Sequence, residues 1–273
     1  MTQTTSGHIQ LSDGSLYYET AGTGEALVLC HAGFVDSRMW DDQWAALAER
    51  YRVVRFDMRG YGRSAPPSGP ICRRDDLLLV LERLGIERAT LVGCSLGGEI
   101  ALDFALEHPE MVAALALVSA VPSGFELQGE PPRYLFEMMG AVESGDLERA
   151  AELQTRIWVD GSFREPEQVD PALRERSAAM SRIALRNDIW RLVENQPLNP
   201  LDPPAAGRLG ELRVPALIVA GELDDPEILR AAQALEAGIA DSRREIIPGC
   251  AHVPGMEQPE RFNQTLLDFL AGV

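Results

Sequence analysis

The chain has 273 residues, a length that suits a single α/β domain carrying an insertion. Hydrophobic residues make up 45% of it and charged residues 25%, a balance that excludes fibrous, repetitive and disordered proteins. The formal net charge of -17 repels phosphate backbones and anionic lipid headgroups, so we expect no nucleic-acid or membrane partner and instead a neutral small molecule.

The sequence carries no targeting or metal-binding pattern. Residues 1–10 are polar, and the longest apolar run, 111–118, is far shorter than the about 20 residues that span a bilayer. The 4 cysteines show no C-x-x-C pairing and are typical of buried free thiols. We therefore expect a cytoplasmic monomer or homodimer with no metal, disulfide or organic cofactor.

The first predicted elements are short strands. Residues 9–11 and 16–20 flank a tight turn and predict an antiparallel start to the sheet. Residues 26–30 are apolar throughout, as in a strand covered on both faces, and lead into His-Ala-Gly-Phe at 31–34. Ligands of open α/β sheets bind at the carboxyl ends of strands. We expect backbone N–H groups of this loop to form half of an oxyanion hole.

A helix is predicted over 41–50, a strand over 52–56 and a second helix over 73–84. The polar, glycine-containing turn at 57–64 resembles a phosphate-binding loop. It lacks the Lys-Ser/Thr ending of such a loop and does not open directly into a helix, so we predict a structural role for it.

The sequence Gly-Cys-Ser-Leu-Gly at 93–97 joins an apolar strand pattern at 89–92 to an apolar helix pattern at 100–106. This arrangement is typical of a nucleophile elbow, where small residues allow a sharp turn and the central side chain is exposed. We predict that Ser95 is the nucleophile and that Cys94 only packs. A hydroxyl here would lie at the positive end of a helix.

Strand and helix patterns alternate up to the apolar strand at 113–118, which predicts an α/β fold: a mostly parallel twisted sheet with helices on both faces. Between 122 and 207 only helical patterns occur. We predict a helical cap over 122–207, inserted in a core domain of residues 1–121 and 208–273. The cap helices are expected at 133–139, 147–158, 171–185 and 189–192.

The cap carries several large apolar side chains. Helical spacing alone buries one stripe of each helix, so we expect a minority of these residues to reach a substrate pocket. Our candidates for pocket lining are Phe34, Phe136, Met139, Trp158 and Trp190.

The alternation resumes with a buried strand at 214–220, an acidic loop, a helix at 227–238, a strand at 243–247 and a final helix at 257–270. The glycine-containing loop before the last helix holds His252. Of the 4 histidines it is the one placed to act as a general base, because His8 lies in a strand, His108 ends a helix and His31 is expected to orient its loop.

A catalytic imidazole needs an acceptor for its second nitrogen, and the acidic loop offers Glu222, Asp224 and Asp225. We choose Asp224, because Asp225 precedes Pro226 and is placed to cap the next helix. The order Ser, Asp, His along the chain is that of α/β-hydrolases and differs from those of chymotrypsin and subtilisin.

The whole chain resembles the α/β-hydrolase family, most closely its small esterase, enol-lactonase and cofactor-free perhydrolase members with a helical cap. The resemblance implies an oxyanion hole formed by the N–H groups of Leu96 and Gly33, with Phe34 as the alternative donor, because Ala32 stands where the family usually has glycine. Serine at the elbow is unlike haloalkane dehalogenases and epoxide hydrolases, which carry aspartate. The matching motifs are His31-Ala32-Gly33-Phe34, Asp57-x-Arg59-Gly60-x-Gly62-x-Ser64, Gly93-x-Ser95-x-Gly97, Gly221-x-x-Asp224 and Gly249-x-x-His252.

We therefore expect a serine hydrolase that cleaves small or medium carboxylic esters or lactones through an acyl-enzyme. The same triad also suits cleavage of a carbon–carbon bond next to a ketone, or peracid formation, because these reactions differ in pocket shape and water placement. A ligand-binding receptor built on a hydrolase fold is a further alternative. It would bind a partner protein when ligand is added and show negligible hydrolysis.

Overall fold

The computed structural model describes residues 3–189 and 198–273. Eight strands form one sheet in the order β1-β2-β4-β3-β5-β6-β7-β8. Only the β1–β2 and β2–β4 pairs are antiparallel, and the other neighbours run parallel. The strands are β1 (Thr5–Leu11), β2 (Gly14–Ala21), β3 (Ala26–Cys30), β4 (Arg52–Phe56), β5 (Ala89–Cys94), β6 (Val112–Val118), β7 (Ala216–Gly221) and β8 (Ser242–Ile247).

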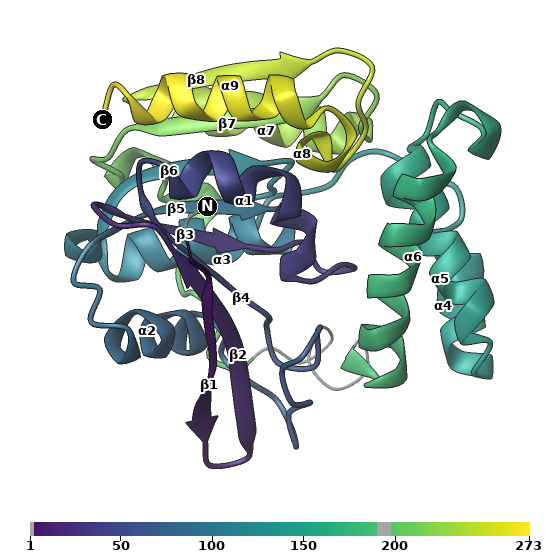
Figure 1. The fold of residues 1–273 in the computed structure, drawn as a ribbon. Helices are drawn as coiled ribbons and strands as arrows, with labels where there is room; N and C mark the ends of the chain where they lie inside the picture. Colours follow the sequence, from purple (N-terminus) through teal and green to yellow (C-terminus); the bar gives the residue numbers. More distant parts are fainter. Residues whose placement is uncertain (1–2, 190–197) are drawn as a thin grey trace.

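Helices cover both faces of this sheet (Figure 1). On one face α1, α8 and α9 pack over a core that includes Leu27 and Leu29, and on the other α2, α3 and α7 pack over a core that includes Val28. Neighbouring residues of β3 thus point to opposite faces. The predicted fold class is confirmed. These helices are α1 (Asp41–Ala48), α2 (Arg73–Arg83), α3 (Leu96–Glu107), α7 (Pro226–Gly238), α8 (Pro254–Glu257) and α9 (Pro259–Leu270).

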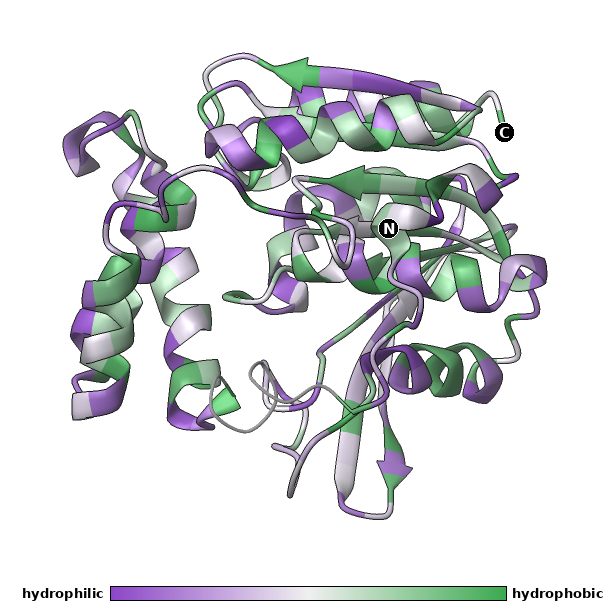
Figure 2. Cartoon of the chain, turned by 180° about the vertical axis from the view of Figure 1, so that it is seen from behind, coloured by the Kyte–Doolittle hydropathy of each residue, from purple (hydrophilic) through white to green (hydrophobic). Residues whose placement is uncertain are grey.

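Apolar residues account for this arrangement. Every residue of β5 is buried, which agrees with its lack of polar alternation. The outer helices are amphipathic, and Figure 2 shows hydrophobic and hydrophilic residues side by side along them. No helix among residues 3–189 and 198–273 is long and apolar enough to cross a bilayer.

The chain segment that connects β6 to β7 forms three further helices. They are α4 (Leu135–Ser144), α5 (Leu147–Thr155) and α6 (Pro171–Arg186). They pack on one another beside the sheet and have a small core of their own around Met138 and Leu153 (Figure 1). The described residues of segment 122–207 contain no strand. Of the helix expected at 189–192, residues 190–192 lie outside the described residues.

The helix expected over 133–139 is α4, which extends to Ser144, and two other predicted helices are interrupted. The helix expected over 147–158 is α5 followed by a π-helical turn, Arg156–Asp160, in which Asp160 is fully buried. The final helix is split in two at Gln258, which has an extended φ of -135°. The proline at 259 disfavours helical geometry in the residue before it, which explains the break.

Candidate active site

Ser95 occupies the sharp turn between β5 and α3. Its φ of 52° and ψ of -117° are strained for a residue with a side chain. Glycines allow this turn: a Cβ added to Gly93 would lie 2.2 Å from the Gly97 carbonyl oxygen, and one added to Gly97 would lie 2.3 Å from the Cys30 carbonyl oxygen. The backbone thus requires glycine on both sides of the serine.

His252 and Asp224 face each other in the loops that follow β8 and β7. The Nδ1 atom of His252 lies 3.0 Å from each carboxylate oxygen of Asp224, and both side chains are almost fully buried. Because Nδ1 is turned to the carboxylate, the neutral ring presents Nε2 as an acceptor. Nε2 has no hydrogen-bond partner in the described part of the chain.

Backbone contacts hold these two loops together. The N–H of Leu223 donates to the Cys250 carbonyl oxygen at 2.8 Å. A Cβ on Gly221 would lie 2.0 Å from the Ala251 carbonyl oxygen, so the close approach of the loops needs glycine there. Asp225 caps α7 by accepting the Glu227 N–H at 2.9 Å, the role that its place before a proline predicts.

The loop after β3 lies against the elbow, since a Cβ on Gly33 would be 3.1 Å from Leu96 Cδ2. In residues 3–189 and 198–273, the N–H groups of Gly33, Phe34 and Leu96 have no acceptor. Free donors at a helix start suit a developing oxyanion. Both Gly33 and Phe34 therefore remain candidates to pair with Leu96.

His31 fixes the conformation of this loop. Its Nε2 accepts the Met58 N–H at 2.9 Å, so Nδ1 carries the proton and donates to the Ala32 carbonyl oxygen at 2.8 Å. Complete burial lowers the pKa of His31, which favours the neutral ring. The Tyr61 hydroxyl donates to the Gly33 carbonyl oxygen at 2.9 Å and holds the next residue.

The turn at 57–64 has structural contacts of its own. The Asp57 carboxylate accepts the N–H groups of Ser37 and Arg63, at 2.9 Å and 2.8 Å. The Arg59 guanidinium pairs with the carboxylates of Asp13 and Asp76. These bonds connect strands and helices of the core and agree with the role expected for the turn.

A cavity of about 470 Å³ opens beside Ser95 and His252. Most of its lining is apolar, and among its described lining residues it has carboxylates but no arginine. Such a mainly apolar pocket with a few polar groups is typical of small-molecule sites. The lining residues are Ser95, Leu96, Glu99, Val121, Leu127, Gly129, Glu130, Pro131, Pro132, Leu135, Trp158, Asp225, Glu227, Ile228 and His252.

The five residues expected to line the pocket differ in where the structure places them relative to the cavity. Trp158 lines it, with its ring 4.7 Å from that of His252. Phe34 is buried beside it, with the two rings 6.2 Å apart, and Met139 packs against the small core around Met138 and Leu153. The side chain of Phe136 is 72% exposed and its neighbour Leu135 takes the place in the lining. Trp190 lies outside the described residues.

Several lining residues were not expected from the sequence. Leu127, Pro131 and Pro132 lie in an irregular segment that has no periodic pattern, so no sequence signal points to them. Ile228 lies in the first turn of α7, next to the acidic loop. This position, close to the predicted Asp224 site, is the one sequence feature that indicates it as a lining residue.

The cysteines lie in the interior of the protein. All four thiols are free and buried. Cys94 is fully buried, and burial raises its pKa, so the thiol form is favoured. Among the described residues no group of His, Cys, Asp and Glu has the geometry of a metal site.

Comparison with known proteins places this geometry in a family. The model of the alpha/beta hydrolase fold matches residues 25–259. The chain belongs to the α/β-hydrolase fold family. It is therefore a hydrolase of this fold, and the resemblance seen in its five motifs is confirmed.

Relatives within the family are named for different substrates. The chain is 31% identical to a 2-hydroxy-6-oxononadienedioate/2-hydroxy-6-oxononatrienedioate hydrolase of Paraburkholderia phymatum, over 97% of the chain and 96% of the relative. It is 28% identical to a 2-hydroxy-6-oxo-6-phenylhexa-2,4-dienoate hydrolase of Comamonas testosteroni, over 95% and 92%. A solved N-acyl homoserine lactone degrading enzyme superposes with a TM-score of 0.78 at 25% identity, covering 96% of the chain and all of that enzyme.

Proposed function

We propose that Ser95, His252 and Asp224 act as a catalytic triad. Ser95 Oγ attacks a carbonyl carbon while His252 Nε2 takes its proton, and Asp224 holds the ring and stabilises its charged form. The N–H of Leu96, together with that of Gly33 or Phe34, receives the negative charge that develops on the carbonyl oxygen. The observation that supports this proposal is that Ser95 and His252 line one cavity while Asp224 binds the far side of the imidazole.

The curated relatives favour a carbon–carbon bond as the one that is cleaved. In that reaction Ser95 adds to a ketone carbonyl. The dienol reacts as its 2-oxo tautomer, in which the carbon next to the ketone is a saturated CH2. Collapse of the adduct breaks the bond to this carbon, and its electron pair is delocalised over the neighbouring enone as a dienolate. His252 returns the proton to this leaving group, and water then releases the acyl group from Ser95, again with His252 as base.

A second candidate is hydrolysis of a neutral carboxylic ester or lactone by the same residues. The cavity lining favours it, because the lining is mainly apolar and the charged residues among its described members are acidic, with Glu227 paired to Arg230. The relatives' dienoates are anions, and these described lining residues include no cation that would bind the charge of such a substrate. The lactone-degrading structural neighbour supports the same candidate.

A direct comparison of two substrate types tests the choice. Purified protein is assayed with 2-hydroxy-6-oxo-6-phenylhexa-2,4-dienoate and with p-nitrophenyl acetate, butyrate and octanoate, each also with Ser95→Ala. A kcat/KM for the dienoate at least about tenfold above that of every ester, lost in Ser95→Ala, establishes carbon–carbon cleavage. The reverse ratio establishes the ester candidate. Turnover that survives in Ser95→Ala contradicts the triad.

A further inference from the structure

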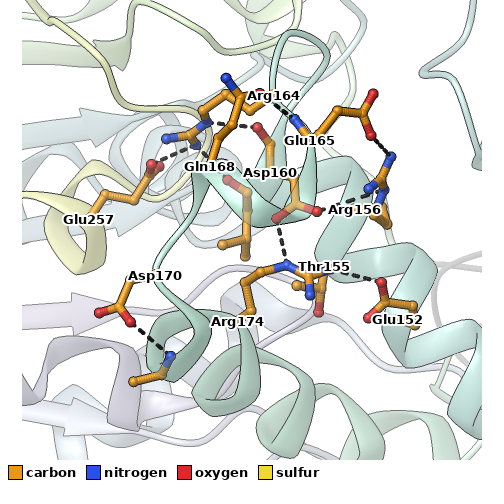
Figure 3. Close-up of polar contacts among 12 residues, drawn as sticks. Glu152, Thr155, Arg156, Asp160, Arg164, Glu165, Gln168, Asp170, Arg174 and Glu257 are labelled. Atoms are coloured by element: carbon orange, nitrogen blue, oxygen red, sulfur yellow. Dashed lines mark hydrogen bonds and ion pairs between the residues drawn. The ribbon is translucent and has the colours of Figure 1, made fainter.

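A side chain of the cap contacts the loop that carries His252. Arg164 follows the π-helical turn and is largely buried. Its guanidinium donates to Glu257 Oε2 at 2.7 Å (Figure 3). It also donates to the Gly249 carbonyl oxygen at 3.1 Å. It also donates to the carbonyl oxygens of Val159 and Asp160, at 2.6 Å and 2.9 Å. The Arg164 guanidinium therefore holds the end of the π-helical turn and the His252 loop in a fixed position relative to each other.

Glu257 extends this contact to the residue next to His252. Its second oxygen, Oε1, accepts the Ala251 N–H at 2.8 Å, so both carboxylate oxygens are in use. Its side chain is 5% exposed. Burial raises the pKa of Glu257, and the Arg164 guanidinium acts against this rise by compensating the charge of the carboxylate. Loss of either partner would leave a buried group unpaired.

The backbone of the cap also meets this loop. The His252 N–H donates to the Trp158 carbonyl oxygen at 3.3 Å. At Gly161, which has a φ of 75°, an added Cβ would lie 2.8 Å from Ala251 Cβ and 2.9 Å from the Leu223 carbonyl oxygen. The turn that carries Trp158 is thus in contact with the loops of both His252 and Asp224.

The π-helical turn is itself anchored inside the cap. Asp160 is fully buried, and its Oδ1 accepts from Arg174 Nε of α6 at 2.8 Å. Arg156 lies 3.7 Å from Oδ2 and also pairs with Glu165 at 2.8 Å (Figure 3). These ion pairs tie residue 160 to α6. The carbonyl group of residue 160, to which Arg164 donates, therefore cannot move independently of α6.

We propose that Arg164 and Glu257 are a positioning pair through which the cap sets the place of the His252 backbone. This inference rests on the proposed triad, since it assigns the pair a role in catalysis through His252. Neither side chain lines the cavity, so neither is a catalytic residue. The pair acts on the step in which His252 moves a proton, and not on substrate binding.

Kinetics of matched variants test the proposal, using the probe substrate that the wild type turns over faster, p-nitrophenyl butyrate or the phenyl dienoate. Arg164→Met and Glu257→Gln are expected to lower kcat about tenfold to a hundredfold with KM changed less than about twofold. The kcat of the double variant is expected to equal that of the less active single variant, because both substitutions break the same Arg164–Glu257 contact. Arg164→Lys is expected to recover part of kcat, since a lysine reaches fewer of these acceptors at once.

Hydrogen–deuterium exchange supplies a readout that needs no turnover. Exchange in a peptide spanning residues 249–252 is expected to accelerate in Arg164→Met and in Glu257→Gln. The control is Arg182→Met, which removes an arginine of α6 whose ion-pair partners, Glu148 and Glu175, lie in α5 and α6. It is expected to leave both kcat and this exchange unchanged.

Different results overturn the two proposals separately. An unchanged kcat, a rise in KM alone, or unchanged exchange in 249–252 overturns the positioning pair. If Arg164→Met does not fold, Arg164→Lys and Glu257→Gln decide the question by the same criteria. Wild-type protein that turns over neither substrate overturns the proposed function, and the exchange experiment still decides whether Arg164 holds the loop.

Discussion

His252 Nδ1 lies 3.0 Å from both carboxylate oxygens of Asp224, and the exposed fractions of the two side chains are 1% and 2%. A carboxylate in this position fixes which ring nitrogen carries the proton and compensates the charge of a protonated ring. Nε2 has no hydrogen-bond partner among the described residues, and His252 and Ser95 line the same cavity. This relationship makes the ring a usable base.

Replacement of Asp224 by asparagine tests this role. The amide retains the shape of the side chain but stabilises the wrong tautomer of His252. We expect kcat to fall by about 10⁴, the loss seen for the corresponding change in a serine protease triad. The measurement is steady-state kinetics on the better probe substrate. The matched control, Asp170→Asn at the N-cap of α6, keeps a good cap and is expected to keep full activity. A loss below tenfold in Asp224→Asn would contradict the assignment.

The elbow glycines give a prediction about folding. In Gly97→Ala the new Cβ would meet the Cys30 carbonyl oxygen at 2.3 Å, a backbone clash that cannot be relieved locally, so we expect no soluble native protein. In Gly140→Ala, in helix α4, the new Cβ meets nothing within 4 Å, and we expect stabilisation of about 0.5–1 kcal/mol. Soluble yield and urea unfolding measure both. A stable, folded Gly97→Ala protein would refute the packing described here.

His31 gives a pH dependence of stability. Its pKa in the folded protein lies below the ordinary value of 6.5, so below about pH 6.5 the unfolded chain binds more protons at this residue than the folded one does. The stability contributed by the neutral ring is therefore complete above that pH and is lost as the pH falls, by at most about 1.4 kcal/mol per pH unit. Protonation of Nε2 would also break its bond to the Met58 N–H.

Urea unfolding between pH 8 and pH 5 measures this effect. His31→Gln cannot titrate, so the free energy of unfolding of this variant should depend less on pH than that of wild type. His8→Gln, at an exposed position in β1, is the control and should follow wild type. Equal slopes for His31→Gln and wild type would show that His31 does not contribute to the pH dependence.

The cavity lining predicts a change in chain-length preference. Leu135 lines the cavity, so a larger Leu135→Trp side chain should lower kcat/KM for p-nitrophenyl octanoate about tenfold and leave the acetate almost unchanged. Phe136→Trp, at the exposed neighbouring position, should not change the profile. If Phe136→Trp altered the preference and Leu135→Trp did not, the pocket would lie elsewhere.

Local patterns predicted much of this molecule. The elbow is encoded within 93–97 by residues adjacent in the chain, and the helix cap at Asp225 follows from the proline after it. The lining of the pocket was less predictable, because helical spacing shows that one side of α4 is buried but does not distinguish Leu135 from Phe136. The bond between Arg164 and Glu257 joins residues 93 positions apart. No spacing rule connects them, since their approach depends on how the cap sits on the sheet.

Covalent labelling of Ser95 tests the central claim most directly. A fluorophosphonate reacts with an activated serine without requiring the natural substrate. The chain contains no lysine, so trypsin cleaves after arginine alone and releases Ser95 in the peptide 89–133. We predict one label per chain, located on Ser95 by mass spectrometry, with no label in Ser95→Ala and much slower labelling in His252→Ala. An unlabelled wild-type protein, or equal labelling of Ser95→Ala, would contradict Ser95 as the nucleophile.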